Sequence, residues 1–164
     1  DSDYIFEMDA DFSHDPRYLP VFLHYVQEYD LVIGSRFLKK VSIKNRTLWR
    51  NVVSKTTKWF MNILTGIDLT DVTTGFKCFR REFLKNIDLD KIYSRGYAFQ
   101  IEMSYAARKS GARIKEIPIL FTEREIGRSK MALLIMLEGI VLILRLTFCR
   151  FTVGANHFAP TRSS

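Results

Sequence analysis

The sequence predicts an α/β domain built around a parallel sheet, and three observations support this fold class. Residues 3–8 form an apolar run that stops at acidic residues, as a buried strand does where it meets a site. Asp15-Pro16 then predicts a helix start, because Asp favours the N-cap and Pro the first helical position. Residues 30–34 predict a second buried strand. Strand, helix and strand in this order are typical of a βαβ unit.

The rest of the chain alternates in the same way. Apolar spacing predicts helices at 48–64, 81–87 and 97–109, strands at 76–79 and 114–121, and a loop at 68–75. Gly111 is expected to stop the third of these helices. Pro118 cannot donate a ladder hydrogen bond, so it places the last strand at a sheet edge or a bulge.

Composition narrows the class of protein. The chain has 164 residues, of which 47% are hydrophobic, enough for one compact domain with a real core. Its formal charge of +7 favours an anionic partner or simply a soluble surface. Two cysteines without metal-ligand spacing predict neither a disulfide framework nor a zinc site, and a reducing compartment fits. Basic residues are not interleaved with stacking aromatics, so no nucleic-acid partner is expected.

The segment 131–148 is the most apolar part, with 14 apolar residues in 18. Its two charges, Glu138 and Arg145, are seven residues apart and share one helical face. A helix with one narrow charged stripe suits a membrane interface or a protein groove. A buried core helix is the alternative.

Two carboxylates one residue apart, Asp9 and Asp11, follow the first predicted strand. In open α/β sheets, ligands bind outside the carboxyl ends of the strands. Carboxylate oxygens are the ligands that Mg²⁺ and Mn²⁺ prefer, usually shared with substrate phosphates. The alternative is a solvated turn that caps the next helix.

Cationic side chains form a second candidate group: Arg36, Arg50, Arg124 and Lys130. Arg holds phosphate oxygens in a bidentate fork, whereas Lys acts as a point charge. Taken singly, such residues are more often solvated surface cations. The loop 124–130 contains a glycine and joins a strand to the apolar segment, so it could close over a phosphate. Glu102 lies in an amphipathic helix and is either functional or an ordinary surface residue.

Several polar motifs follow one another along the chain. They are Asp9-Ala-Asp-Phe-Ser-His14, Gly34-Ser-Arg36, Arg50-Asn-Val-Val-Ser-Lys55, Asp71-Val-Thr-Thr-Gly-Phe76 with Arg80 and Arg81, Ser94-Arg-Gly-Tyr-Ala-Phe-Gln-Ile-Glu-Met103, and Pro118-Ile-Leu-Phe-Thr-Glu-Arg124 continuing to Lys130. Across residues 3–131, their order and spacing resemble those of the dolichol-phosphate (polyprenol-phosphate) mannosyltransferases of glycosyltransferase family 2.

The resemblance implies a GT-A fold, with a mixed, mostly parallel sheet flanked by helices over residues 1–130. An apolar, membrane-associated helix at 131–150 and an irregular tail at 151–164 would follow. Asp9 and Asp11 would bind Mg²⁺ or Mn²⁺ with the donor diphosphate, and Asp11 and Arg36 would lie at the reacting centre. Three cations, Arg50, Arg124 and Lys130, would grip the donor and the lipid phosphate. Glu102 would lie in the acceptor-side helix as a further substrate-binding residue.

The implied reaction is metal-dependent, inverting transfer of mannose from GDP-mannose to a polyprenyl phosphate. The enzyme would be membrane-associated, with its active site facing the cytoplasm. One alternative is a related transferase that uses a UDP-sugar with the same lipid class. Another is a non-catalytic module that binds a membrane surface.

Two departures from the family pattern carry expectations of their own. The family begins with a nucleotide-binding strand–helix region, and nothing here matches it. We therefore expect a truncated chain that is inactive alone. Residue 128 is Arg where relatives often have Glu, which alters the charge of the loop 124–130.

Overall fold

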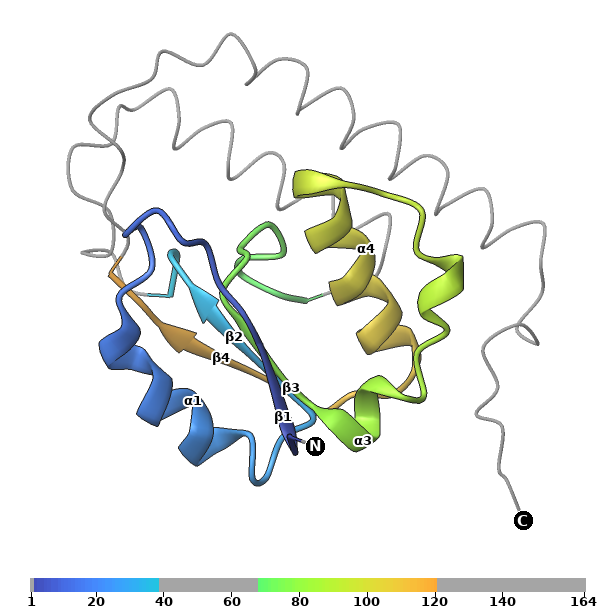
Figure 1. Cartoon of the computed structure of the whole chain (residues 1–164), viewed down its shortest axis with the longest axis horizontal. Helices are drawn as coiled ribbons and strands as arrows, with labels where there is room; N and C mark the ends of the chain where they lie inside the picture. Colours follow the sequence, from blue (N-terminus) through green and yellow to red (C-terminus); the bar gives the residue numbers. More distant parts are fainter. Residues whose placement is uncertain (1, 39–67, 121–164) are drawn as a thin grey trace, which may run out of the picture.

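A four-stranded sheet forms the centre of the molecule (Figure 1). The computed structural model describes residues 2–38 and 68–120. Within them the strands lie in the order β1-β3-β2-β4. Their bounds are Tyr4–Glu7 for β1, Leu31–Ser35 for β2, Lys77–Arg80 for β3 and Ile114–Pro118 for β4. The predicted edge position of Pro118 is confirmed, because β4 is the last strand of this sheet.

Strand pairing differs from the simple βαβ expectation. β1 and β2 run in the same direction, but β3 lies between them and pairs antiparallel with both. β4 pairs parallel with β2, with Leu31 opposite Ile114. The mixed sheet is confirmed, and β1, β2 and β4 share one direction. Most of the pairings among the described strands are nevertheless antiparallel, because a segment far along the chain inserts between the first two strands.

The helices follow the predicted order. A 3₁₀ turn, Pro16–Tyr18, leads into α1, Leu19–Tyr25, and the Asp15 carboxylate caps this start by accepting from the Arg17 amide at 2.9 Å. The helix expected at 81–87 is shorter, because α3 spans only Arg81–Leu84. A second 3₁₀ turn covers Leu89–Lys91, and α4 spans Gly96–Lys109.

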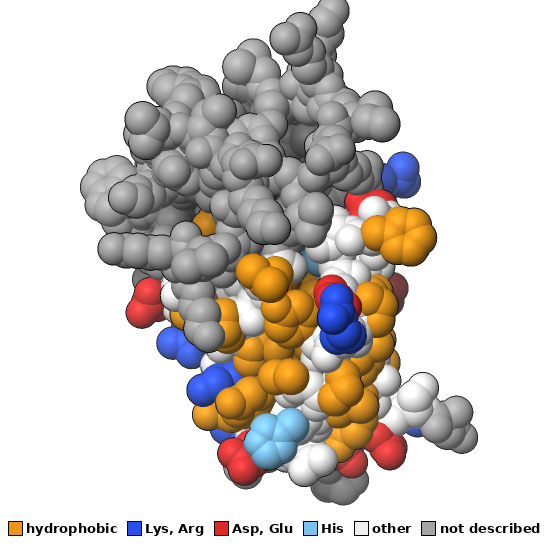
Figure 2. Space-filling view, turned by 90° about the vertical axis from the view of Figure 1, so that its left-hand side faces the viewer, with side chains coloured by type: hydrophobic (Ala, Val, Ile, Leu, Met, Phe, Trp, Pro, Cys, Tyr) orange, Lys and Arg blue, Asp and Glu red, His pale blue; other side chains and the backbone are white. Residues whose placement is uncertain are grey.

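Helices cover both faces of the sheet, with α1 on one side and α4 on the other (Figure 1). Phe22 of α1 and Val26 directly after it pack with Val32, whereas α4 packs against Leu31 and Ile33 on the other face. Seen from the α1 side, apolar side chains gather on the outer surface as well (Figure 2). Val21 and Leu23 of α1 are among the exposed ones.

Gly34 permits the closest packing on the α1 face. A Cβ atom at this position would lie 3.1 Å from side-chain atoms of both Phe22 and Ile119. Such contacts are tighter than ordinary van der Waals contact, so the Gly34-Ser-Arg36 motif needs its glycine for packing.

Several predicted elements lie outside the described residues: the helix at 48–64, the apolar helix at 131–150 and the tail at 151–164. Within residues 2–38 and 68–120, no helix is long and apolar enough to cross a membrane.

Candidate active site

The candidate site lies at one end of the sheet, where the arrowheads of β2 and β4 point toward the upper left in Figure 1. β1, β2 and β4 share a direction, so their carboxyl ends meet at this edge. β3 runs the other way, so the loop 68–76 that enters it lies at the same edge. Three segments distant in sequence are thus brought together: the acidic loop, defined as residues 9–14, the end of β2 at Arg36, and the loop 68–76.

Short-range hydrogen bonds shape the acidic loop. The Ser13 amide donates to Asp11 Oδ1 at 2.9 Å, and the Ser13 hydroxyl bonds the same oxygen. The Asp9 amide donates to His14 Nδ1 at 3.0 Å. Phe12, at the tip, has a positive φ of 64° and an exposed ring. The serine and histidine of this motif therefore set the backbone that carries both aspartates.

His14 acts in this loop as a buried hydrogen-bond acceptor. Its ring stacks on Phe76 with centroids 4.8 Å apart. Burial lowers the pKa of His14 below its ordinary value of 6.5, although the Asp9 charge opposes this. The neutral ring accepts the Asp9 N–H through Nδ1, so that nitrogen is not available to a metal. The sequence placed His14 at the end of the first motif but did not indicate this role, although the spacing from Asp9 to His14 was the available signal.

The aspartates suit a hard cation. The Asp9 side chain is 58% exposed, and its Oδ1 would lie 3.3 Å from a Cβ atom at Gly75. The glycine thus leaves space for this carboxylate beside the loop 68–76. No group of three or more His, Cys, Asp or Glu gathers as a metal cage in the described parts of the chain. Two carboxylates could hold Mg²⁺ or Mn²⁺, which share their coordination with phosphates and water.

Arg36 is bound by a buried carboxylate. Its Nε donates to Asp71 Oδ2 at 2.7 Å and its Nη2 to Asp71 Oδ1 at 2.8 Å. The same Nη2 also donates to Thr73 Oγ1 at 2.7 Å. The fork predicted to hold a phosphate is therefore engaged with the loop 68–76. A direct contact between Arg36 and the donor stays a prediction, whereas its grip on Asp71 is a feature that the sequence did not indicate.

Glu116 of β4 holds the other side of this loop. Its carboxylate accepts from the amides of Thr70 and Asp71, each at 2.9 Å, and from the Thr70 hydroxyl at 2.7 Å. Arg36, directly after β2, and Glu116, in β4, thus both hydrogen-bond to the loop 68–76. The sequence carried little signal for this contact, because 45 residues separate Glu116 from Asp71.

Glu102 lies inside the molecule and not on its surface. It is buried in α4, and Oε2 accepts the amide of Ser94 at 2.9 Å. The alternative of an ordinary surface glutamate is therefore wrong. The carboxylate secures the segment before α4, and its proposed contact with the acceptor stays a prediction.

A further polar network lies beneath the end of β1. Lys77 is completely buried, and its Nζ donates to the main-chain oxygen of Gln100 at 2.8 Å and to Oε1 at 2.7 Å. Gln100 Nε2 in turn donates to Glu7 Oε1. Sequence reasoning singled out none of these three residues, although Lys77 follows directly after the motif that ends at Phe76.

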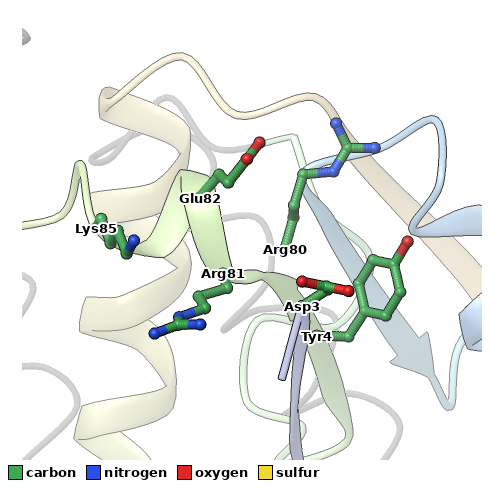
Figure 3. Close-up of a pocket in the computed structure, with 6 residues that line it drawn as sticks. All are labelled: Asp3, Tyr4, Arg80, Arg81, Glu82 and Lys85. Carbon is green, nitrogen blue, oxygen red and sulfur yellow. The ribbon is translucent and has the colours of Figure 1, made fainter. Parts of the chain in front are cut away.

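A pocket of about 340 Å³ lies at the opposite end of the sheet (Figure 3). Its lining comes from the start of β1, the end of β3 and α3: Asp3, Tyr4, Arg80, Arg81, Glu82 and Lys85. The Arg80 guanidinium reaches the turn after α1, where it donates to the carbonyl oxygens of Val26 and Gln27. This pocket is remote from the acidic loop and is not part of the candidate active site.

The other predicted cations, Arg50, Arg124 and Lys130, lie outside the described residues.

Comparison with known proteins identifies the family. The family model described as "Glycosyl transferase family 2" matches residues 1–88, more than half of the chain. The chain belongs to glycosyl transferase family 2. The matched family segment contains the acidic loop, Arg36, Asp71 and Lys77, and ends before α4.

Relatives confirm the narrower resemblance to polyprenol-phosphate mannosyltransferases. The undecaprenyl-phosphate mannosyltransferase of Micrococcus luteus is 43% identical over 143 residues, covering 87% of this chain and 59% of that protein. The polyprenol monophosphomannose synthase of Mycolicibacterium smegmatis is 43% identical over 127 residues, covering 77% and 48%. This family 2 chain thus spans about half the length of these relatives.

A solved structure supports the GT-A-type fold. The crystal structure of glucosyl-3-phosphoglycerate synthase from Mycobacterium tuberculosis, in complex with uridine diphosphate, matches with a TM-score of 0.62. The match covers 90% of this chain and 50% of that one, at 15% sequence identity. At such low identity the likeness concerns the fold alone.

Proposed function

We propose that this chain provides the metal-binding and phosphate-binding part of an enzyme that transfers mannose from GDP-mannose to a polyprenyl phosphate. The acidic loop at the carboxyl edge of the sheet carries this proposal. Its two aspartates are held by Ser13 and His14 in a loop whose shape leaves the Asp9 carboxylate exposed. Two relatives at 43% identity bear the names of polyprenyl-phosphate mannosyl transfer enzymes.

The proposed reaction is a direct displacement at the anomeric carbon. A bond forms between this carbon and a phosphate oxygen of the lipid, while the bond to the donor diphosphate breaks. A phosphate monoester is largely ionised near neutral pH, so no strong general base is needed. The harder problem is to bring two anions together. Mg²⁺ or Mn²⁺ on Asp9 and Asp11 would supply positive charge for the departing diphosphate.

The other predicted residues have roles in orientation. Arg50, Arg124 and Lys130 would neutralise and align the two phosphates, and Glu102 would lie on the acceptor side. For Arg36 we propose two roles. It holds the loop 68–76 through Asp71 beside the aspartates, and its charge adds to the positive potential at the donor.

A chimera tests the transfer reaction, because the chain spans about half of its relatives. This chain would replace the aligned segment of the Micrococcus luteus enzyme, and membranes would receive polyprenyl phosphate, Mn²⁺ and either GDP-mannose or UDP-glucose. We expect lipid-linked mannose, and its loss in the Asp11→Ala chimera without a change in melting temperature. UDP-glucose serves as the control donor, because the part of the chimera that precedes the aligned segment comes from the Micrococcus luteus enzyme. Undiminished transfer by Asp11→Ala would refute the metal assignment.

We also propose that the segment 131–150 lies at the membrane, with the active site facing the cytoplasm. The apolar composition of this segment supports the proposal. Liposome flotation of the chain with and without residues 131–148 tests it. We expect the shortened chain to lose liposome binding. Equal recovery of both chains in the unbound fraction would assign this segment to the protein core.

A further inference from the structure

Lys77 is a buried cation for which the proposed reaction has no use. Its side chain is fully buried, and its ammonium donates to two oxygens of one residue, Gln100. A buried ammonium is costly unless it is paired and hydrogen-bonded. Burial lowers the pKa of Lys77 to about 8, and the charges of Glu7 and Asp71 oppose this shift. The groups that face the ammonium come from three elements: Glu7 from β1, Asp71 from the loop 68–76 and Gln100 from α4.

Lys77 determines which way the Gln100 amide points. Because Nζ donates to Oε1, this oxygen faces β3, and the amide nitrogen must face away from the ammonium. That nitrogen donates to Glu7 Oε1. Glu7 and Lys77 are also directly opposite one another in the β1–β3 ladder. The three side chains therefore form a bridge from β3 through α4 to the end of β1. We call Lys77, Gln100 and Glu7 the buried bridge.

The buried bridge ends beside the proposed metal ligand. Glu7 is the last residue of β1, and Asp9 follows two residues later. Gln100 Nε2 and Asp9 Oδ1 also approach the same point on Gly75, at 3.5 Å and 3.3 Å from a Cβ atom built there. The amide and the carboxylate thus lie over the same glycine. A shift of Gln100 or of the β1 end would change where Asp9 presents its oxygens.

We infer that Lys77 is a positioning residue, which acts through Gln100 and Glu7 to hold Asp9 where it binds a divalent cation with a nucleoside diphosphate. The inference rests on the proposed function, because the ligand is the metal–diphosphate group of that site. Outer groups that orient metal ligands typically contribute 10- to 100-fold to metal affinity. Pre-organisation of this kind requires the supporting side chains to be locked by packing and hydrogen bonds, as these are.

The test measures Mn²⁺ binding to the full chain in the presence of GDP, by the electron paramagnetic resonance signal of free Mn²⁺. Lys77→Met and Gln100→Met each break the bridge, and we expect both to weaken Mn²⁺ binding about tenfold. Lys77→Arg keeps a cationic donor and should recover part of the lost affinity. Melting temperatures would establish that each variant is folded at the temperature of the titration.

Ser104→Ala is the matched control. Ser104 is also fully buried and donates to the same Gln100 carbonyl at 2.9 Å, but it does not contact the Glu7 end of the bridge. We expect it to lower the melting temperature and leave Mn²⁺ affinity unchanged. Wild-type affinity in folded Lys77→Met or Gln100→Met, or an equal loss in Ser104→Ala, would overturn the inference alone. Absence of Mn²⁺ binding by the wild-type chain would overturn the proposed function and this inference with it.

Discussion

The two ends of the sheet carry the same arginine–aspartate arrangement in different surroundings. At the candidate site, the amide and Nε of Arg36 donate to Asp71 Oδ2, and Nη2 donates to Oδ1. At the opposite end, Arg113 makes the same three bonds to Asp30. The side chains of the first pair are 17% and 0% exposed, whereas those of the second are 61% and 15% exposed. The same arrangement is thus buried at one end of the sheet and more exposed at the other.

This difference indicates where charge determines structure. Water screens Arg113, and Asp30 keeps a second cation, Arg80, at 3.9 Å when Arg113 is lost. Asp71 has no access to water, so its charge depends on Arg36 and on the neighbouring donors. The buried Arg36–Asp71 pair therefore holds the loop 68–76 in place at the candidate site. Loss of the more exposed Arg113–Asp30 pair should cost the fold less stability.

The largest expected effect is that of Arg36→Ala. It leaves the Asp71 carboxylate buried without its main partner, which should lower the free energy of unfolding by about 3–5 kcal/mol. Urea denaturation followed by circular dichroism measures this change. The double variant Arg36→Ala/Asp71→Asn should recover part of the loss, because it removes the buried charge. A loss below about 1 kcal/mol would show that the buried pair behaves like a surface pair.

Gly34→Ala tests whether the candidate-site end of the sheet also depends on close packing. The new methyl group would press on Phe22 and Ile119 at 3.1 Å, and we expect a loss of about 1–2 kcal/mol in unfolding free energy. Gly111→Ala is not a suitable control because Gly111 has a positive φ of 83°. Ala10→Gly, at an exposed position in the acidic loop, serves instead. An unchanged urea midpoint for Gly34→Ala would mean that the two neighbours repack freely.

His14 should make the candidate site sensitive to mild acid. Its pKa in the folded chain lies below 6.5 because the ring is buried. As pH falls through 6.5, the unfolded chain therefore takes up a proton that folded His14 does not, and the free energy of unfolding decreases. His14→Asn keeps an acceptor for the Asp9 amide and should flatten this dependence between pH 7 and pH 5.5.

The control for this pH dependence is His24→Asn, because His24 is exposed on α1. Urea midpoints of the wild type and both variants, measured between pH 7 and pH 5.5, provide the comparison. An equally steep dependence in His14→Asn would assign the acid sensitivity to another group.

Arg113→Ala has the smallest expected effect, about 0–1 kcal/mol, because Arg113 is largely exposed and Asp30 keeps Arg80 nearby. High salt should reduce even this difference, since exposed charges are screened. The same urea protocol in low and high salt provides the measurement. A loss as large as that of Arg36→Ala would remove the contrast between the two ends of the sheet.

Local sequence determined the elements and the acidic pair. The cap at Asp15, the apolar spacing of α1 and α4, and the edge position of Pro118 were all predictable, because each depends on neighbouring residues or on backbone chemistry. The same holds for Asp9 and Asp11 at the end of a strand. Family resemblance added the GT-A-type fold and the enzyme class.

Tertiary structure alone decided which distant groups meet. It inserted β3 between β1 and β2, paired Arg36 with Asp71, placed Glu116 against the loop 68–76 and assembled the buried bridge. The side-chain contacts among these join residues 23 to 93 positions apart. Composition and periodicity indicate which face of a helix or strand is apolar. They do not indicate which polar side chains from different elements will form hydrogen bonds with one another. Those partners are chosen by the requirement that every buried charge finds a hydrogen bond, and this requirement can be evaluated only once the chain has packed.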